Sequence, residues 1–170
     1  CCYMRCPVRG NQEGGVRVSK NILVVYKKNF EDVHDDALDI VKNTLEKIGE
    51  DLDINVNYSA REKVNREDFI ERDLVVVLGG DGTLTSIAHS VDENTPVMGV
   101  NSHPRDMDND GSYGFYMGSD PINFKEDIQK ALSNNAIVNI LPRLQAEIST
   151  TSGNIIRSDP ALNDLLLANT

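Results

Sequence analysis

One carboxylate stands inside a glycine-rich turn that directly follows a strongly apolar segment. Residues 74–78 read Leu-Val-Val-Val-Leu, and residues 79–83 read Gly-Gly-Asp-Gly-Thr. Five apolar residues rich in β-branched side chains are too few for a helix and predict a central parallel strand. Closely spaced glycines let backbone N–H groups approach a ligand. Asp81, at the centre of the turn, is therefore a candidate for accepting a hydroxyl proton or holding Mg²⁺.

The segment after the turn decides how the Asp-Gly pair is interpreted. A hairpin would require a second strand with alternating apolar residues, and the sequence does not supply one. Instead, apolar residues recur with helical spacing, at Leu84, Ile87, Ala88 and Val91. The favoured interpretation is strand, turn and helix, with the hairpin as the alternative. It places the carboxylate outside the carboxyl end of a strand, where open α/β sheets bind ligands.

The common phosphate-binding motifs do not match this turn. A dinucleotide fingerprint needs a glycine at position 85, which is Thr, and a Walker loop needs a lysine that is absent here. A phosphate-handling loop without lysine must depend on backbone donors, the positive end of a helix and a divalent cation.

The rest of the chain alternates between strand and helix patterns. Strands are expected over residues 21–26, 54–58, 74–78 and 97–100, and helices over 35–48, 66–71 and 123–132, with Gly49 as a helix end. This alternation predicts an α/β fold, with a Rossmann-like parallel sheet and helices on both faces.

The pattern changes from residue 137 onward. Residues 137–148 and 154–156 are expected to form strands of a hairpin around 151–153, and residues 161–168 a further strand. The tail therefore resembles the opening of an all-β unit.

Spaced motifs in the chain resemble those of one enzyme family. The glycine-rich pentapeptide is shared by NAD kinases and by diacylglycerol and sphingosine kinases, and 6-phosphofructokinases carry a close variant. Residues 96–102 (Pro-Val-Met-Gly-Val-Asn-Ser), 111–116 (Gly-Ser-Tyr-Gly-Phe-Tyr) and 161–164 (Ala-Leu-Asn-Asp) resemble further NAD kinase segments in the right order. Lipid kinases would carry a Gly-Thr-Gly-Asn-type segment, which is not seen. The chain is thus identified as a member of the NAD kinase family.

Two departures from the bacterial pattern resemble the plant NADH kinase and mitochondrial NAD kinase branch. Residues 102–110 lengthen the loop after Gly-Val-Asn, and the last motif reads Asn-Asp rather than Asn-Glu. NADH is therefore an alternative substrate to NAD.

The resemblance implies transfer of the γ-phosphate of ATP to the adenosine 2′-hydroxyl of NAD or NADH, giving NADP(H). It makes Asp81 the catalytic proton acceptor, and it implies ATP as donor and Mg²⁺ as the cation, without a dedicated protein metal site. The nucleotide-binding residues that it implies are Gly79, Gly80, Gly82, Thr83, Asn101, Phe115, Asn163 and Asp164. A lipid kinase and a non-catalytic nucleotide-binding fragment remain as alternatives.

The expected organisation is a flexible leader over residues 1–19, an α/β nucleotide-binding domain over 20–136 and the start of a β-rich NAD-binding domain over 137–170. In the family the NAD site lies between the two domains, so we expect the isolated chain to have low activity. For the complete protein the resemblance implies a homo-oligomer.

The composition of the chain limits the classes of partner that it is expected to bind. The chain has 39% apolar and 26% charged residues, a net charge of −10 and a pI near 4.7. Such acidity argues against non-specific binding to nucleic acid or an anionic membrane. The sequence shows neither a transmembrane span nor a secretory signal, so a cytoplasmic location is expected.

Several other features receive simpler interpretations. Cys1, Cys2 and Cys6 lack the further ligands of a zinc site. Residues 106–111 match only the first half of an EF-hand loop, so a solvated acidic insertion is favoured over a calcium site. Arg105 is expected to pair with neighbouring carboxylates more readily than with phosphate, and His89 is expected to be a solvated side chain.

Overall fold

The computed structural model describes residues 19–28, 32–105 and 111–166. Its centre is a four-stranded parallel sheet in the order β2-β1-β3-β4. The strands are β1 (Lys20–Tyr26), β2 (Ile54–Ala60), β3 (Leu74–Gly79) and β4 (Val97–Asn101). The helices are α1 (Asp32–Asp51), the 3₁₀ helix η1 (Arg66–Phe69), α2 (Asp81–Ile87) and α3 (Phe124–Leu132). The α/β fold predicted from the sequence is confirmed.

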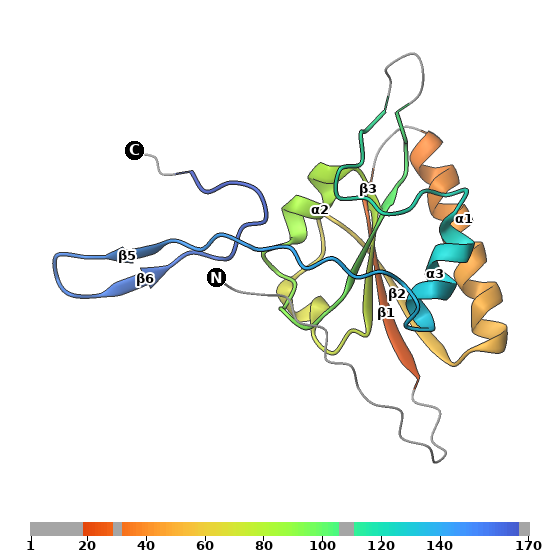
Figure 1. Ribbon diagram of the computed structural model, residues 1–170, viewed down its shortest axis with the longest axis horizontal. Helices are drawn as coiled ribbons and strands as arrows, with labels where there is room; N and C mark the ends of the chain where they lie inside the picture. Colours follow the sequence, from red (N-terminus) through yellow and green to blue (C-terminus); the bar gives the residue numbers. More distant parts are fainter. Residues whose placement is uncertain (1–18, 29–31, 106–110, 167–170) are drawn as a thin grey trace.

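The central strands β1 and β3 are buried on both faces, as apolar strands without polar alternation require, whereas the edge strand β2 is partly exposed. In β1, Ile22 and Val24 face the apolar cluster formed with α1 and α3, whereas Leu23 and Val25 face the cluster formed with η1 and α2. All six residues of β3 are buried. Figure 1 shows α1 and α3 together on one side of the sheet and α2 on the other.

The strand order creates a switch point beside the glycine-rich turn. From β1 the chain passes through α1 to β2 on one side, and then returns to add β3 on the other side of β1. In open α/β sheets, ligands bind outside the carboxyl ends of the strands where the order reverses. The carboxyl ends of β1 and β3 flank that point, and β3 leads directly into Gly80 and Asp81.

A β-hairpin projects from the α/β body (Figure 1). It consists of β5 (Glu147–Ser149) paired antiparallel with β6 (Ile155–Arg157), and its turn contains Gly153 at φ +86°. The predicted hairpin is therefore confirmed, although its strands are short.

Two strand predictions in this region were wrong. Residues 137–146 form no strand, and in residues 161–166 the β pairing is limited to one isolated bridge between Leu144 and Ala161. Residues 167 and 168 lie outside the described part. The apolar composition suggested strands, but a strand needs a neighbour for its backbone N–H and C=O groups, and residues 133–142 are exposed throughout.

Two helix boundaries also differ from the prediction. Helix α1 continues through Gly49 to Asp51, because an exposed glycine inside a helix costs only about 1 kcal/mol. Helix α2 already begins at Asp81 and ends at Ile87, so Val91 is buried in the turn beyond it. Within the described residues, no helix is long and apolar enough to cross a membrane.

Candidate active site

The glycine-rich turn places Asp81 at the start of α2. Gly80 is the N-cap, with extended backbone angles, and its carbonyl oxygen accepts the N–H of Thr83 at 2.9 Å. Asp81 is therefore the first residue of the helix, where the helix dipole favours a negative charge. The glycine-rich turn thus places the carboxylate of Asp81 at the start of α2.

Two of the glycines are required by close packing. A Cβ atom on Gly79 would lie 2.3 Å from Oγ1 of Thr83, whose side chain is buried. A Cβ on Gly80 would lie 3.0 Å from Oγ of Ser112. At Gly82, by contrast, a Cβ would meet nothing within 4 Å. Gly82 is thus the exposed side of the turn, where a ligand can come close to the backbone.

The carboxylate of Asp81 is held by a segment distant in the sequence. Its Oδ2 accepts the N–H of Phe115 at 3.0 Å, and its Oδ1 accepts the N–H of Tyr116 at 2.8 Å. The Asp81 residue is half-buried. These two hydrogen bonds join the glycine-rich turn to the segment 111–116. No local pattern in the sequence could indicate this link.

Asn101 is a buried residue whose side chain holds the loop next to Asp81 by hydrogen bonds. It pairs with Gly79 in the register of β3 and β4, and it is only 6% exposed. Its Nδ2 donates to the carbonyl oxygen of Ser112 at 3.0 Å, and its Oδ1 accepts the N–H of His103 at 3.3 Å. The side chain thus ties together the two ends of the loop between β4 and Phe115.

Gly114 allows this arrangement, so we expect its replacement to be destabilising. It has φ +63°, and a Cβ there would lie 2.5 Å from Nδ2 of Asn101. Gly114→Ala should lower the free energy of unfolding by about 1–3 kcal/mol, because left-handed backbone and overpacking both oppose a side chain. Urea unfolding measures this. Gly118→Ala is the matched control, since a Cβ there meets nothing within 4 Å; equal stability of the two variants would contradict the prediction.

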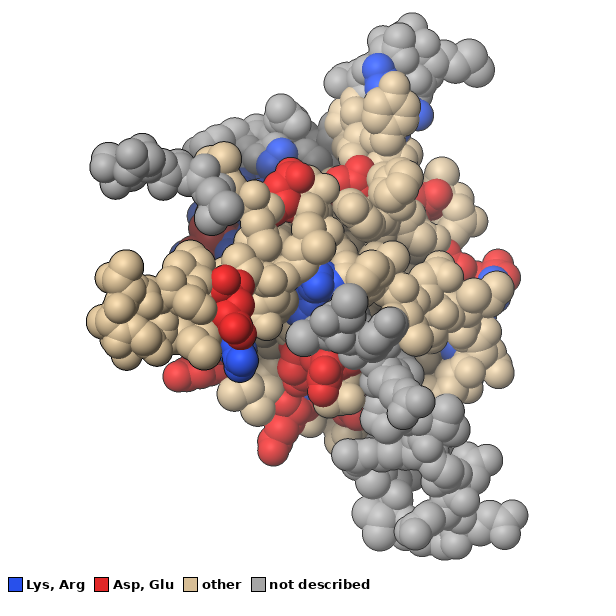
Figure 2. Space-filling view, turned by 60° about the vertical axis from the view of Figure 1, so that its left-hand side comes forward, with Lys and Arg blue, Asp and Glu red and all other residues tan. Residues whose placement is uncertain are grey.

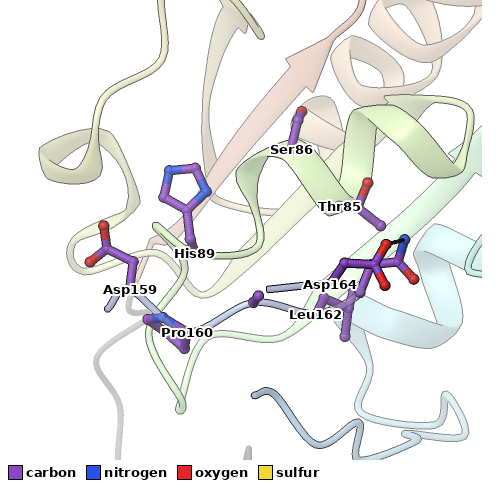
Figure 3. A pocket seen from close by; sticks show the side chains of 9 residues that line it. Thr85, Ser86, His89, Asp159, Pro160, Leu162 and Asp164 are labelled. Atoms are coloured by element: carbon purple, nitrogen blue, oxygen red, sulfur yellow. Dashed lines mark hydrogen bonds between the residues drawn. The ribbon is translucent and has the colours of Figure 1, made fainter. Parts of the chain in front are cut away.

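The predicted residues Asn163 and Asp164 lie along α2. They line a groove of about 360 Å³ together with Thr85, Ser86 and His89 of the helix and the turn after it (Figure 3). Nδ2 of Asn163 donates to Oδ2 of Asp164 at 3.0 Å. The neighbouring Leu162 packs against the apolar cluster beneath α2 and secures this segment.

Asp81 is not among the residues that line this groove, but it lies on the same face of α2. Thr85 follows it by four residues, which places the two side chains one turn apart on one side of the helix. The structure therefore brings Asn163 and Asp164 beside the helix that Asp81 begins. The groove also includes five residues that the motifs did not indicate, namely Thr85, Ser86, the exposed His89, Asp159 and Pro160.

Asn101 opens instead onto a second groove, of about 310 Å³, shared with Gly114 and α3. There the Nζ of Lys130 lies 2.7 Å from Oε1 of Glu126. A hydrogen bond from Lys130 lowers the pKa of Glu126, and the same bond raises the pKa of Lys130. Both groups thus remain charged near neutral pH.

The segment whose N–H groups bind Asp81 also carries exposed aromatic rings. Phe115 is 83% exposed, and its ring packs edge-on against Tyr116 with centroids 5.1 Å apart. Tyr113 is 81% exposed, and the guanidinium of Arg105 lies 4.1 Å from its ring centroid. The acidic residues expected to pair with Arg105, residues 106–110, lie outside the described part, as do the three cysteines.

Charge is dispersed around these elements. Figure 2 shows acidic and basic side chains in small groups separated by uncharged surface. Among the described residues, no three His, Cys, Asp or Glu side chains are placed to hold a metal ion.

Comparison with known families agrees with this arrangement. The family model described as the ATP-NAD kinase N-terminal domain matches residues 25–136. The chain belongs to the NAD kinase family. The match covers α1, the glycine-rich turn, Asn101 and Phe115 but not residues 161–164, and the family membership predicted from the motifs is thereby confirmed.

Individual relatives show the same relationship over shorter stretches. The NAD kinase of Pseudomonas fluorescens is 34% identical over 96 residues, which are 56% of this NAD kinase family chain and 29% of that protein. The NAD kinase of Halorhodospira halophila is 31% identical over 110 residues, 62% of this chain and 33% of that protein. The NADH kinase of Arabidopsis thaliana is 53% identical over 32 residues, 19% of this chain and 10% of that protein.

These matches span about a third or less of the length of the curated relatives. Among solved structures, a ThuA-like protein from Bacteroides uniformis gives a TM-score of 0.40 at 12% identity, over 55% of this chain and 40% of that chain. That likeness is too weak to bear on the site.

Proposed function

We propose that the protein to which this chain belongs transfers the γ-phosphate of ATP to the adenosine 2′-hydroxyl of NAD or NADH. The observation that carries the proposal is the position of Asp81, a carboxylate fixed at the start of α2 by two backbone N–H groups, in a chain of the NAD kinase family. It stands at the end of β3, beside the switch point of the sheet.

The reaction balances with one proton transfer. The 2′-oxygen attacks the γ-phosphorus, so an O–P bond forms while the bond from the γ-phosphorus to the oxygen bridging it to the β-phosphate breaks and ADP leaves. The hydroxyl proton passes to the carboxylate of Asp81 and then to solvent. A carboxylate is a far weaker base than the alkoxide of a ribose, so it cannot deprotonate the hydroxyl in advance, and proton transfer accompanies the attack through a loose transition state.

The hydrogen bonds of Asp81 leave room for this role. A carboxylate has about four lone-pair sites, and Phe115 and Tyr116 occupy two of them. The remaining sites can accept a ribose hydroxyl. Because the amide contacts already fix the carboxylate, little reorganisation is needed when the substrate binds, which is the condition for effective positioning.

The phosphate side of the site is formed by the turn. We propose that the backbone of the turn formed by Gly79, Gly80, Gly82 and Thr83 faces the triphosphate, with the exposed Gly82 as its point of closest approach. Mg²⁺ would enter as part of the nucleotide and would supply positive charge against the triphosphate, which an acidic chain otherwise disfavours. A Cβ on Gly82 would meet no protein atom within 4 Å, and this open space supports the proposal that the triphosphate approaches the turn there.

The dinucleotide side is formed by Phe115, Asn163 and Asp164. An aromatic ring that is 83% exposed offers a flat apolar face to an adenine. The amide and carboxylate in the α2 groove offer a donor and acceptors to ribose hydroxyls. Asn101, which is buried and hydrogen-bonded within the protein, would contribute to nucleotide binding by shaping the loop.

We also propose that residues 137–166 begin a second, β-rich unit in a protein that assembles as a homo-oligomer. Large apolar side chains of the β5–β6 hairpin are exposed, including Ile148, Ile155 and Ile156. Apolar side chains gathered on one hairpin are typical of a surface that another element covers.

The test is product formation by the gene product that contains this sequence. It is incubated with Mg²⁺, either NAD or NADH, and either ATP or polyphosphate, and NADP(H) is quantified with a NADP-specific dehydrogenase. We expect ATP-dependent formation of NADP(H) from at least one dinucleotide. Phosphorylation of diacylglycerol or sphingosine with no NADP(H) formed would support the lipid kinase alternative and contradict the proposal.

A further inference from the structure

The segment after α3 is attached to the α/β body through one buried residue. Between Ser133 and Leu166, a stretch that the structure describes throughout, Arg143 alone is buried, at 7% exposure. Arginine is almost never so buried unless its donors are paired. The buried guanidinium of Arg143 therefore anchors this part of the chain, together with the partly buried Leu162, which packs beneath α2.

The guanidinium binds the end of α2 that lies opposite Asp81. Its Nη1 donates to the carbonyl oxygens of Ala88 and Val91, both at 2.7 Å. Ala88 is the C-cap of α2, where carbonyl groups lack helical partners and the helix dipole favours a cation. The Nε is buried and has no hydrogen-bond partner in the described residues. The side chain of Arg143 thus supplies hydrogen bonds to carbonyl groups at the helix end, although leaving its own buried Nε–H without a partner costs free energy.

The anchor is connected to the groove by a short chain of contacts. Leu144, the residue after Arg143, exchanges two hydrogen bonds of 2.7 Å with Ala161. Leu162, next in the chain, packs beneath α2. Asn163 and Asp164 follow immediately in the groove.

We propose that Arg143 is a positioning residue that holds Asn163 and Asp164 against the helix that Asp81 begins. The effect on dinucleotide binding rests on the proposed function. Helix α2 then carries the reacting carboxylate at its first residue, and the anchor of the ribose-binding pair lies at its C-cap and in the turn beyond it. One short rigid element sets the spacing between the two.

The first test is amide hydrogen exchange on the 170-residue chain. Arg143→Met removes the donors and keeps an unbranched side chain of similar reach. Arg157→Met is the matched control, because Arg157 is exposed on the β5–β6 hairpin that follows Arg143 and pairs with Glu147 at 2.9 Å. We expect exchange at the amides of Leu144 and Ala161 to become at least about tenfold faster in Arg143→Met, and not in the control.

Amides of β1 and β3 distinguish local release from general destabilisation, and their exchange should be unchanged in both variants. Arg143→Lys, which keeps a cation and donors, should restore part of the protection. Unchanged exchange at Leu144 and Ala161, or equal acceleration throughout the sheet, would overturn the proposal.

The second test is steady-state kinetics of the gene product that contains this sequence. Arg143→Met should raise KM for the dinucleotide about tenfold, leave KM for ATP unchanged and change kcat by less than about threefold, because positioning of the binding pair is lost while the turn is intact. Arg143→Lys should be intermediate. A fall in kcat with unchanged KM would contradict a positioning role. If the unsubstituted protein forms no NADP(H), the proposed function fails, whereas hydrogen exchange still decides the role of Arg143.

Discussion

Asp81→Asn is expected to lower turnover of NAD or NADH by about 10² to 10⁴, because general-base assistance contributes about that much. The structure adds a second effect. The amide of asparagine has one acceptor oxygen, whereas both carboxylate oxygens of Asp81 accept N–H groups. Phe115 or Tyr116 therefore loses its acceptor. Steady-state kinetics with NADP(H) detection measures the combined loss.

The two effects are separable. Loss of the base lowers kcat alone, whereas release of Phe115 also weakens dinucleotide binding, which calorimetric titration measures. Affinity for ATP should be nearly unchanged, because the glycine backbone is intact. Asp53→Asn is the control, since Asp53 is an exposed carboxylate just before β2, at the opposite edge of the sheet. Near-normal turnover of Asp81→Asn would refute the catalytic assignment.

Gly79→Ala is expected to destabilise the fold and to disable the site together. The new Cβ would lie 2.3 Å from Oγ1 and 2.8 Å from Cβ of Thr83, so α2 must shift. Overpacking of this kind costs about 1–3 kcal/mol, and a displacement of about 1 Å at a reacting group can cost about 10²-fold in rate. Thermal unfolding and NADP(H) formation measure the two losses.

Two other glycines provide the controls for Gly79→Ala. Gly49→Ala, inside α1 with only ordinary contacts to Ile54, should raise stability by about 0.5–1 kcal/mol. Gly82→Ala meets no protein atom within 4 Å, so stability should be preserved while activity falls if phosphate approaches there. A stable and active Gly79→Ala variant would show that the turn tolerates a side chain and that its geometry is not critical.

Local patterns were sufficient for the centre of the fold. The run of β-branched residues favoured a strand covered on both faces, and the periodicity from Leu84 favoured a helix over a hairpin after the turn. The same reasoning failed for residues 137–146, where apolar composition predicted a strand but the described residues provide no neighbouring strand to pair with it. Strand formation depends on a partner, which a local pattern does not contain.

The sequence by itself determined the chemistry available: a carboxylate in a permissive glycine turn, an aromatic residue and an amide–carboxylate pair, in an order typical of NAD kinases. Only the tertiary structure decided how these groups meet. It placed the turn at the switch point of the sheet, gave Asp81 the backbone N–H groups of Phe115 and Tyr116 as partners, and anchored the segment before Asn163 through Arg143. These contacts join residues 34 to 55 positions apart, and such pairings are set by the packing of whole elements rather than by local periodicity.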